Sequence, residues 1–188
     1  LMDHAWRTPG LGELVAIPLY LTALLKQALG GSLPTTKEEV LRSFVTELEQ
    51  DPDKLATLRE AFQGLHRDLL EGLAVEATRE ETVALSESQA RAVVNTVQEH
   101  LRKAKQIAQI LQPMKVLDAL VSAHMLVRSG PGSNGVSFQH QQFQEWFASF
   151  WVQKLMLFVA SGDNDAKKTL REDVLDVPIW EEAVLFAC

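Results

Sequence analysis

A run of large apolar side chains late in this chain constrains its fold more than any other feature. These side chains recur at steps of three and four residues: Phe143, Trp146, Phe147, Phe150, Trp151, Leu155 and Phe158. Such spacing places them on one face of a helix, and a face this apolar must be buried. We therefore predict a core helix here. His140 comes just before it, at the corner where a predicted strand runs into the helix, and the start of a helix favours an anion.

The composition is that of an ordinary globular protein. The chain has 188 residues, of which 46% are hydrophobic and 23% are charged, so one domain or two small ones can form a core. The formal net charge of −7 and the pI of about 5.2 lack the basic character that supplies affinity for a phosphate backbone. Nucleic acid is therefore an unlikely partner.

The cysteine and hydropathy patterns bear on location. Cys188 is the single cysteine, which excludes an internal disulfide and fits a reducing, cytoplasmic compartment. The longest apolar run without a charge, Leu14 to Leu25, is too short to cross a bilayer. We predict a cytoplasmic protein with no membrane contact. Because the chain starts at Leu1 and stops inside an apolar run, we interpret the sequence as a fragment of a longer protein.

Helix signals dominate the first half of the chain. A helix is predicted to begin close to Pro18, since proline is tolerated in a first turn but not deep inside a helix, and to end at Gly30-Gly31. The segment Pro34 to Glu39 combines threonines with glutamates in a capping pattern, which predicts a second helix start.

Further helical patterns follow. Asp51-Pro52 begins a pattern that continues to Leu73, and the polar stretch Glu76 to Glu81 is predicted to be a connector. A second capping box predicts the next helix, and a proline predicts a shorter one after it; these segments are Ser86 to Leu101 and Val116 to Ser122. The segment Ser161 to Asp165 is predicted to be a loop, and another helix is expected to begin after Pro178.

One region has a β pattern. Ala123 to Arg128 and Val136 to Phe138 flank a loop rich in glycine, serine and asparagine, which predicts a hairpin. Helices followed by one hairpin is the order of a winged-helix module. The predicted fold is thus mainly α: a helical subdomain over residues 1–50, a winged-helix-like module with one β-hairpin over residues 51–160, and the start of a further helical domain over residues 161–188.

Motifs for self-contained catalysis are missing from the sequence. It has no G-x-x-x-x-G-K-[ST] phosphate loop, no strand leading into G-x-G-x-x-G and no G-x-S-x-G elbow. The five histidines are scattered without metal-ligand spacing, and neighbouring acids such as Glu80-Glu81 point in different directions on a helix. We predict that the chain is not an enzyme by itself. Taken alone, Pro18 is a helix-start proline and His140 a polar corner residue.

Three separated segments nevertheless resemble one family. Ala16 to Leu25, followed by Leu33 to Val45, resembles the region after the ATPase core of NACHT-type signalling NTPases of the STAND class. Phe138 to Ala148 is similar to the F-x-H-x-x-F-Q-E-aromatic-x-A pattern of their winged helix, and Pro178 to Glu182 to the P-x-W-x-E start of their next helical domain. Between Gln50 and Ser122 the resemblance rests on helix order alone.

The resemblance implies a nucleotide sensor. In such proteins a P-loop domain holds ATP or ADP, a helical domain packs a proline on the adenine, and the winged helix supplies a histidine to the β-phosphate of ADP. Carried over, Pro18 would contact the adenine and His140 the phosphate. A contact made only in the diphosphate state would favour a closed resting form, and ATP would release it.

What the resemblance implies about partners is equally specific. The P-loop, the magnesium-binding segment and the sensor residues are absent from this chain, so it would act on a P-loop NTPase domain of the same parent protein and form a homo-oligomer on activation. ATP or ADP would be the cofactor of the parent, and this chain alone is not expected to hold it tightly. Bacterial antiviral defence is a common role of such proteins. The alternatives are a helical protein-interaction scaffold and, less favoured because Lys115 is the only basic residue of the predicted recognition helix, a DNA-binding winged helix.

Overall fold

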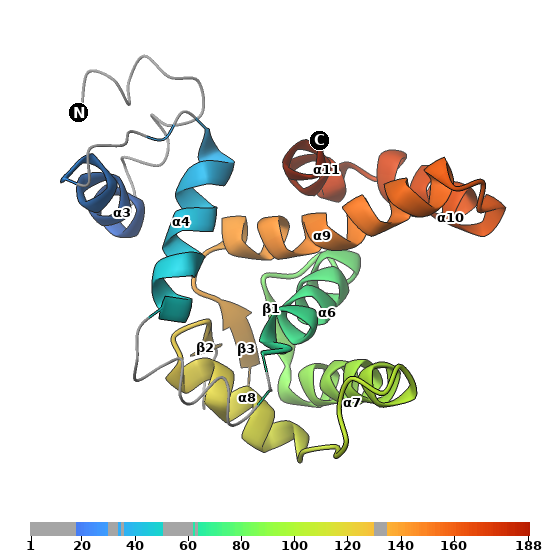
Figure 1. The fold of residues 1–188 in the computed structure, drawn as a ribbon, viewed down its shortest axis with the longest axis horizontal. Coiled ribbons are helices and arrows are strands. Elements are labelled where there is room, and N and C mark those ends of the chain that lie inside the picture. Colours follow the sequence, from blue (N-terminus) through green and yellow to red (C-terminus); the bar gives the residue numbers. More distant parts are fainter. Residues whose placement is uncertain (1–17, 30–33, 35, 51–61, 63, 130–134) are drawn as a thin grey trace. The chain divides into compact units, whose positions relative to one another are not determined.

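The computed structural model describes residues 18–29, 34, 36–50, 62, 64–129 and 135–188. The fold is mainly helical with one small three-stranded antiparallel sheet, as Figure 1 shows, so the predicted fold class is confirmed. The chain divides into two compact units, Leu1–Asp51 and Pro52–Cys188, each with its own internal packing.

The first unit contains two described helices. Helix α3 (Pro18–Leu29) begins at the proline, as predicted, and buries Tyr20 and Leu24. Helix α4 (Lys37–Gln50) begins at the predicted capping signal, because the amide of Glu39 donates to the hydroxyl oxygen of Thr36 at 3.1 Å. Its apolar face is buried through Val40, Leu41 and Val45. The two helices pack against each other.

The described part of the second unit contains a winged-helix-like arrangement. Its elements follow the order helix, strand, helix, helix, strand, strand, and the sheet order is β1-β3-β2. These elements are α6 (His66–Arg79), β1 (Ala84–Ser86), α7 (Glu87–Lys103), α8 (Pro113–Ser122), β2 (Leu126–Ser129) and β3 (Gly135–Phe138). Helix α6 packs against α7, and α7 packs against α8 (Figure 1).

The sheet consists of the predicted hairpin and one unpredicted strand. Strands β2 and β3 pair antiparallel, with Leu126 opposite Phe138, which confirms the hairpin. Strand β1 adds to the free edge of β3, with Leu85 opposite Val136. All four of these side chains are buried, so the sheet has one face on the core.

Caps and polar clamps fix the helices of this unit. Ser86 caps α7 through a full capping box, because its hydroxyl accepts from the amide of Gln89 while the Gln89 side chain accepts from the Ser86 amide. Gln98, only 3% exposed, holds the loop before α8 by accepting from the Leu111 amide at 2.8 Å and donating to the Leu111 carbonyl at 3.1 Å. The capping box predicted at Ser86 is confirmed.

Helix α9 (Gln141–Ala160) is the core helix that the aromatic pattern predicts. Phe143, Trp146 and Phe147 are at most 5% exposed, and the Trp146 ring meets the Phe147 ring edge-on at 4.9 Å. The prediction is wrong for Phe158, which is 55% exposed, because the elements packed on α9 leave this position uncovered. Leu155, at 9%, is the last residue of the predicted stripe that is buried.

The C-terminal tail packs back on α9. It forms α10 (Asn164–Thr169), a π-helical segment η1 (Leu170–Leu175), a 3-10 turn η2 (Pro178–Trp180) and α11 (Glu181–Ala187). Helices α10 and α11 both pack against α9, and Trp180 is 1% exposed. The helix expected after Pro178 is confirmed. The predicted loop over Ser161 to Asp165 is shorter, since Asp163 caps α10 by accepting from the Ala166 amide.

Two helix boundaries differ from the predictions. The pattern predicted from Asp51 through Leu73 is interrupted at Gly64, whose positive φ of 88° ends any helix there, and α6 starts afresh at His66. Residues 51–61 lie outside the described part of the chain. The predicted connector Glu76 to Glu81 is mostly helix, because α6 continues to Arg79 with Ala77 and Thr78 buried.

Candidate functional site

The two residues proposed from the resemblance lie in different units. Pro18 is the first residue of α3 in the first unit, where its missing amide hydrogen costs nothing because first-turn amides have no partner inside the helix. The Pro18 side chain lies outside what the structure describes. His140 lies in the second unit, so each residue is described within its own unit.

His140 forms the corner between strand and helix, as predicted. It follows β3 directly and is the N-cap residue of α9, with extended backbone angles of φ −144° and ψ 149°. Its side chain is half-buried, and its ring centroid lies 6.5 Å from that of Phe143. Within the described chain the imidazole does not cap the helix, so it leaves the first amides to another acceptor.

The end of α9 beside His140 has the polarity that suits an anion. The Phe143 amide donates back to the His140 carbonyl at 3.0 Å, which leaves the preceding amides of Gln141 and Gln142 at the open end of the helix. No acidic residue lies in the first turn of α9, so the positive end of the helix dipole is not offset there by a carboxylate. An anionic oxygen placed here would meet helix amides and an imidazole donor.

The other residues of this motif build the core. Phe138, Phe143, Trp146, Phe147 and Ala148 are all at most 7% exposed. Gln144 is also buried, at 5%, and donates from its amide nitrogen to the Thr78 hydroxyl at 3.3 Å and the Thr82 carbonyl at 3.2 Å. Gln144 thus ties α9 to the end of α6. The motif is mainly a packing device that fixes where His140 stands.

The helix expected to read DNA in a winged helix does not have a basic surface. Helix α8 exposes Lys115 and Asp118, and the Asp118 carboxylate pairs with Arg128 of β2. The Arg128 guanidinium also lies 3.4 Å from the Glu87 carboxylate at the start of α7, so its positive charge is paired with carboxylates of the same unit. This arrangement gives little attraction for a phosphate backbone.

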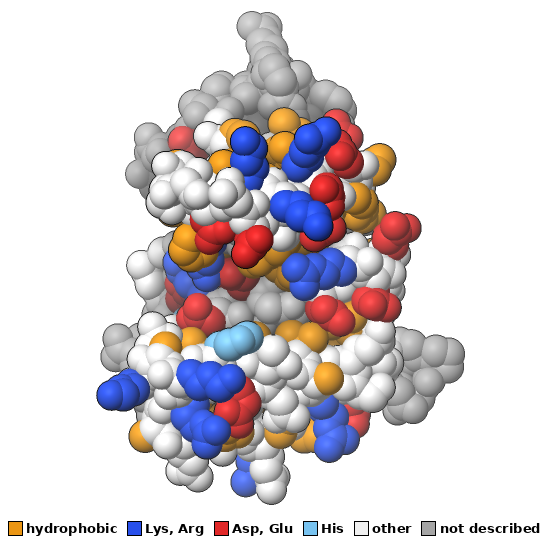
Figure 2. Space-filling view, turned by 90° about the vertical axis from the view of Figure 1, so that its right-hand side faces the viewer, with side chains coloured by type: hydrophobic (Ala, Val, Ile, Leu, Met, Phe, Trp, Pro, Cys, Tyr) orange, Lys and Arg blue, Asp and Glu red, His pale blue; other side chains and the backbone are white. Residues whose placement is uncertain are grey.

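A groove that the sequence did not predict lies between three helices of the second unit. Helix α6 packs on both α7 and α9, and the groove runs along α6 between these two neighbours, with a volume of about 450 Å³. Figure 2 faces this side of the molecule, where acidic and basic side chains alternate with apolar ones. The residues lining it are Asp68, Glu71, Gly72, Val75, Glu76, Arg79, Ala92, Val93, Thr96, Val97, His100, Leu101, Trp151 and Lys154.

Close approach of α6 and α7 makes the floor of the groove apolar. Gly72 faces α7 so tightly that a Cβ atom there would lie 2.6 Å from a methyl carbon of Val97. The same Cβ atom would lie 3.4 Å from a methyl carbon of Val93, so only glycine allows this spacing of the two helices without movement of the neighbouring side chains. The groove is therefore lined by valines where the two helices touch.

An ion pair connects the walls. Both carboxylate oxygens of Glu71 on α6 accept from the Lys154 ammonium of α9, at 2.8 and 2.7 Å. Burial raises the pKa of the Glu71 carboxyl; Lys154 opposes this by its hydrogen bond and its charge, and the negative charge of Asp68 adds to the increase. Glu71 is thus a partly buried carboxylate that pairs with the Lys154 ammonium.

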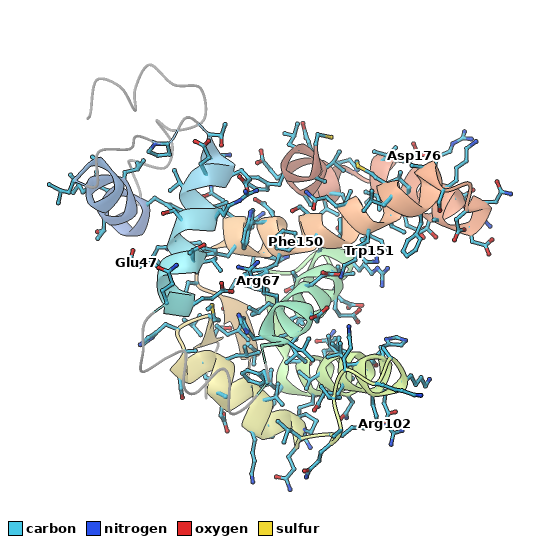
Figure 3. All side chains as sticks on the ribbon, in the orientation of Figure 1. Glu47, Arg67, Arg102, Phe150, Trp151 and Asp176 are labelled. Carbon is cyan, nitrogen blue, oxygen red and sulfur yellow. The ribbon has the colours of Figure 1, made fainter. Side chains whose placement is uncertain are left out.

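Trp151 forms the other wall. The Arg79 guanidinium lies 4.8 Å from the centre of the Trp151 ring, and the Trp180 ring lies 5.1 Å away from it. Figure 3 shows Trp151 between α9 and α6. Sequence reasoning assigned Trp151 to the core stripe and did not single out Glu71, Arg79 or Lys154, because these residues meet only once α6 and α9 are packed.

The described residues also bear on metal binding and on membrane insertion. Among them, no group of three or more histidine, cysteine, aspartate or glutamate side chains is placed to hold a metal ion. No helix within the described ranges is long and apolar enough to cross a membrane.

No protein-family model matches the sequence, and no curated protein matches it.

Proposed function

We propose that this chain is the regulatory, nucleotide-sensing segment of a NACHT-type STAND NTPase. A P-loop domain of the same parent protein would hold ATP or ADP, His140 would contact the β-phosphate of ADP, and Pro18 would pack on the adenine. The chain would supply no catalytic group of its own. Exchange of ADP for ATP would remove the His140 contact, open the resting form and permit a homo-oligomer.

The position of His140 is the observation that carries this proposal. A half-buried imidazole stands as the N-cap of α9, directly after the last strand of a winged-helix-like module, where the open helix end favours an anion. The surrounding motif residues are buried and fix that corner in place. An imidazole donates to a phosphate oxygen whether it is neutral or charged, and such a bond is among the stronger ones in proteins.

The nucleotide content of the purified parent protein tests the proposal. His140→Ala should weaken ADP retention by about tenfold or more, the effect of losing one hydrogen bond to a charged group. His140→Asn, which keeps an amide donor and a good N-cap residue, should retain part of the bound ADP. His100→Ala on α7 is the matched control for removal of a histidine and should leave retention unchanged.

Two results would contradict the proposal. One is a parent protein without a phosphate-binding loop, because His140 alone cannot replace the phosphate cradle. The other is equal ADP retention and equal resting-state inhibition in His140→Ala and the unchanged protein, which would favour the helical interaction scaffold. Duplex DNA binding that weakens steeply with salt would instead favour the DNA-binding alternative.

A further inference from the structure

The groove along α6 has the dimensions of a helix-binding surface. Its lining residues recur at helical steps on both long walls, from Asp68 to Arg79 on α6 and from Ala92 to Leu101 on α7. At 1.5 Å per residue the groove is on the order of 15 Å long, which is about three turns of a helix. A compact small molecule would leave much of such a groove uncovered, whereas a short helix laid along it would fill it.

Half-buried apolar groups line the middle of the groove. Val93 and Val97 of α7 and Trp151 of α9 are all half-buried, although each lines a surface open to solvent. Apolar surface of this kind gains free energy when a partner covers it. Tryptophan in particular contributes strongly to binding surfaces, because it offers a large rigid ring.

Two acidic residues of the α6 wall, Asp68 and Glu76, carry charges without a basic partner in the described part of the chain. Asp68 and Glu76 are half-buried and, among the described residues, neither forms an ion pair. The lysine and arginine side chains of the groove are already engaged, since Lys154 binds both oxygens of Glu71 and Arg79 lies over Trp151. Asp68 and Glu76 are eight positions apart on one helix, about two turns from each other, and both line the groove. The groove thus offers two negative groups beside an apolar centre.

We propose that this groove docks an amphipathic helix that carries basic residues about two turns apart on either side of an apolar centre. The apolar side chains of this helix lie on Val93, Val97 and the part of Trp151 that is exposed beside Arg79 and Trp180, and its lysine or arginine side chains reach Asp68 and Glu76. The docking is independent of the proposed nucleotide contact, because His140 is not among the residues lining the groove.

A synthetic peptide tests the docking on the full chain. The probe is a capped three-turn helix with leucines on one face and two lysines two turns apart, and a second peptide replaces both lysines with glutamates. Titration calorimetry without nucleotide should give saturable binding of the lysine peptide, and at least about tenfold weaker binding of the glutamate peptide.

Variants of the chain locate the binding. Asp68→Lys and Glu76→Lys should each weaken the lysine peptide by about tenfold, and Asp68→Lys should partly restore binding of the glutamate peptide. Asp176→Lys is the matched control: this aspartate is exposed at the end of η1, as Figure 3 shows, and its replacement should have no effect. His140→Ala should also leave peptide binding unchanged, which separates this proposal from the nucleotide proposal.

Three outcomes would overturn the proposal. These are no saturable binding of the lysine peptide, equal binding of the two peptides, and equal loss in the groove variants and in Asp176→Lys. Thermal unfolding of each variant keeps the test decisive, since a variant that folds normally but binds unchanged contradicts the role of its carboxylate.

Discussion

The second half of α9, residues 151–160, is more apolar in sequence than the first half, residues 141–150, yet it leaves more large apolar side chains exposed. In the first half, Phe143, Trp146 and Phe147 are at most 5% exposed and pack under the sheet and α6. In the second half, Val152 and Leu155 are buried, but Leu157 is 71% exposed and Phe158 is 55% exposed. Helical periodicity predicts which residues share a face, but whether a face is covered depends on neighbours that lie far away in the chain.

The largest expected difference between the halves is in core packing. Phe147→Ala should lower the free energy of unfolding by about 3 to 5 kcal/mol, because it leaves a cavity in a fully buried site. The milder Phe147→Leu should cost about 1 to 2 kcal/mol. Phe158→Ala is the control from the second half and should change the free energy by less than about 0.5 kcal/mol. Urea unfolding measures all three, and similar losses at both positions would contradict the comparison.

Loss of a polar contact should lower the free energy of unfolding more in the first half of α9 than in the second, by less than the loss of core packing does. Gln144→Leu keeps the volume of the side chain but leaves the Thr78 hydroxyl and the Thr82 carbonyl without their donor, at a cost of about 1 to 3 kcal/mol. Gln153→Leu removes a 3.5 Å contact to the Ala187 carbonyl at an exposed position and should cost less than about 0.5 kcal/mol. Equal costs in urea unfolding would show that Gln144 does not hold α9 to α6.

The ion pair that joins the second half of α9 to α6 predicts a pH effect. Since burial raises the pKa of the Glu71 carboxyl in the folded state, the folded protein binds a proton there more strongly than the unfolded chain does. The free energy of unfolding therefore loses this contribution as pH rises through the range just above the ordinary pKa of a glutamate. Glu71→Gln has no such proton to lose.

Unfolding of Glu71→Gln and the unchanged protein, compared from about pH 4 to about pH 7, measures this effect. The stability of the variant relative to the unchanged protein should increase with pH. A relative stability that decreases with pH would mean that Lys154, which opposes the increase in pKa, outweighs the burial of the carboxyl. Glu172→Gln on η1 controls for loss of a carboxylate at the surface.

The smallest effect is expected at the most exposed apolar residue of α9. Leu157→Ser should change the free energy of unfolding little, since a side chain that is 71% exposed has little packing to lose. A loss above about 2 kcal/mol would show that the second half of α9 is covered in solution.

Local signals in the sequence were sufficient for most helix starts. Thr36 and Ser86 place their hydroxyls and partners within three residues, so the capping pattern is visible without any tertiary information. The glycine-rich loop likewise predicted the hairpin of β2 and β3. Strand β1 was not predicted, because Ala84 to Ser86 is too short to alternate visibly and forms a strand only beside β3.

The His140 corner and the α6 groove also differ in how far the sequence could predict them. The corner position of His140 was predictable, since the strand and the helix that form it are adjacent in sequence. The α6 groove was not, because Glu71 and Lys154 are distant in sequence and meet through helix packing. The role of Gly72 was not predictable either. A glycine inside a helix only indicates lower helix stability until its close neighbour Val97 on α7 is known.

Strand β1 also has a consequence for folding kinetics. Ala84 pairs with Ser137, so a loop of roughly 50 residues must close before the three-stranded sheet exists, and such closure slows folding. The β2–β3 hairpin can form locally, but its β3 edge stays open until α7 and α8 have brought β1 alongside. Hydrogen exchange of the β1 and β3 amides that bond each other should therefore become slow together and late in refolding, after protection has appeared within α7.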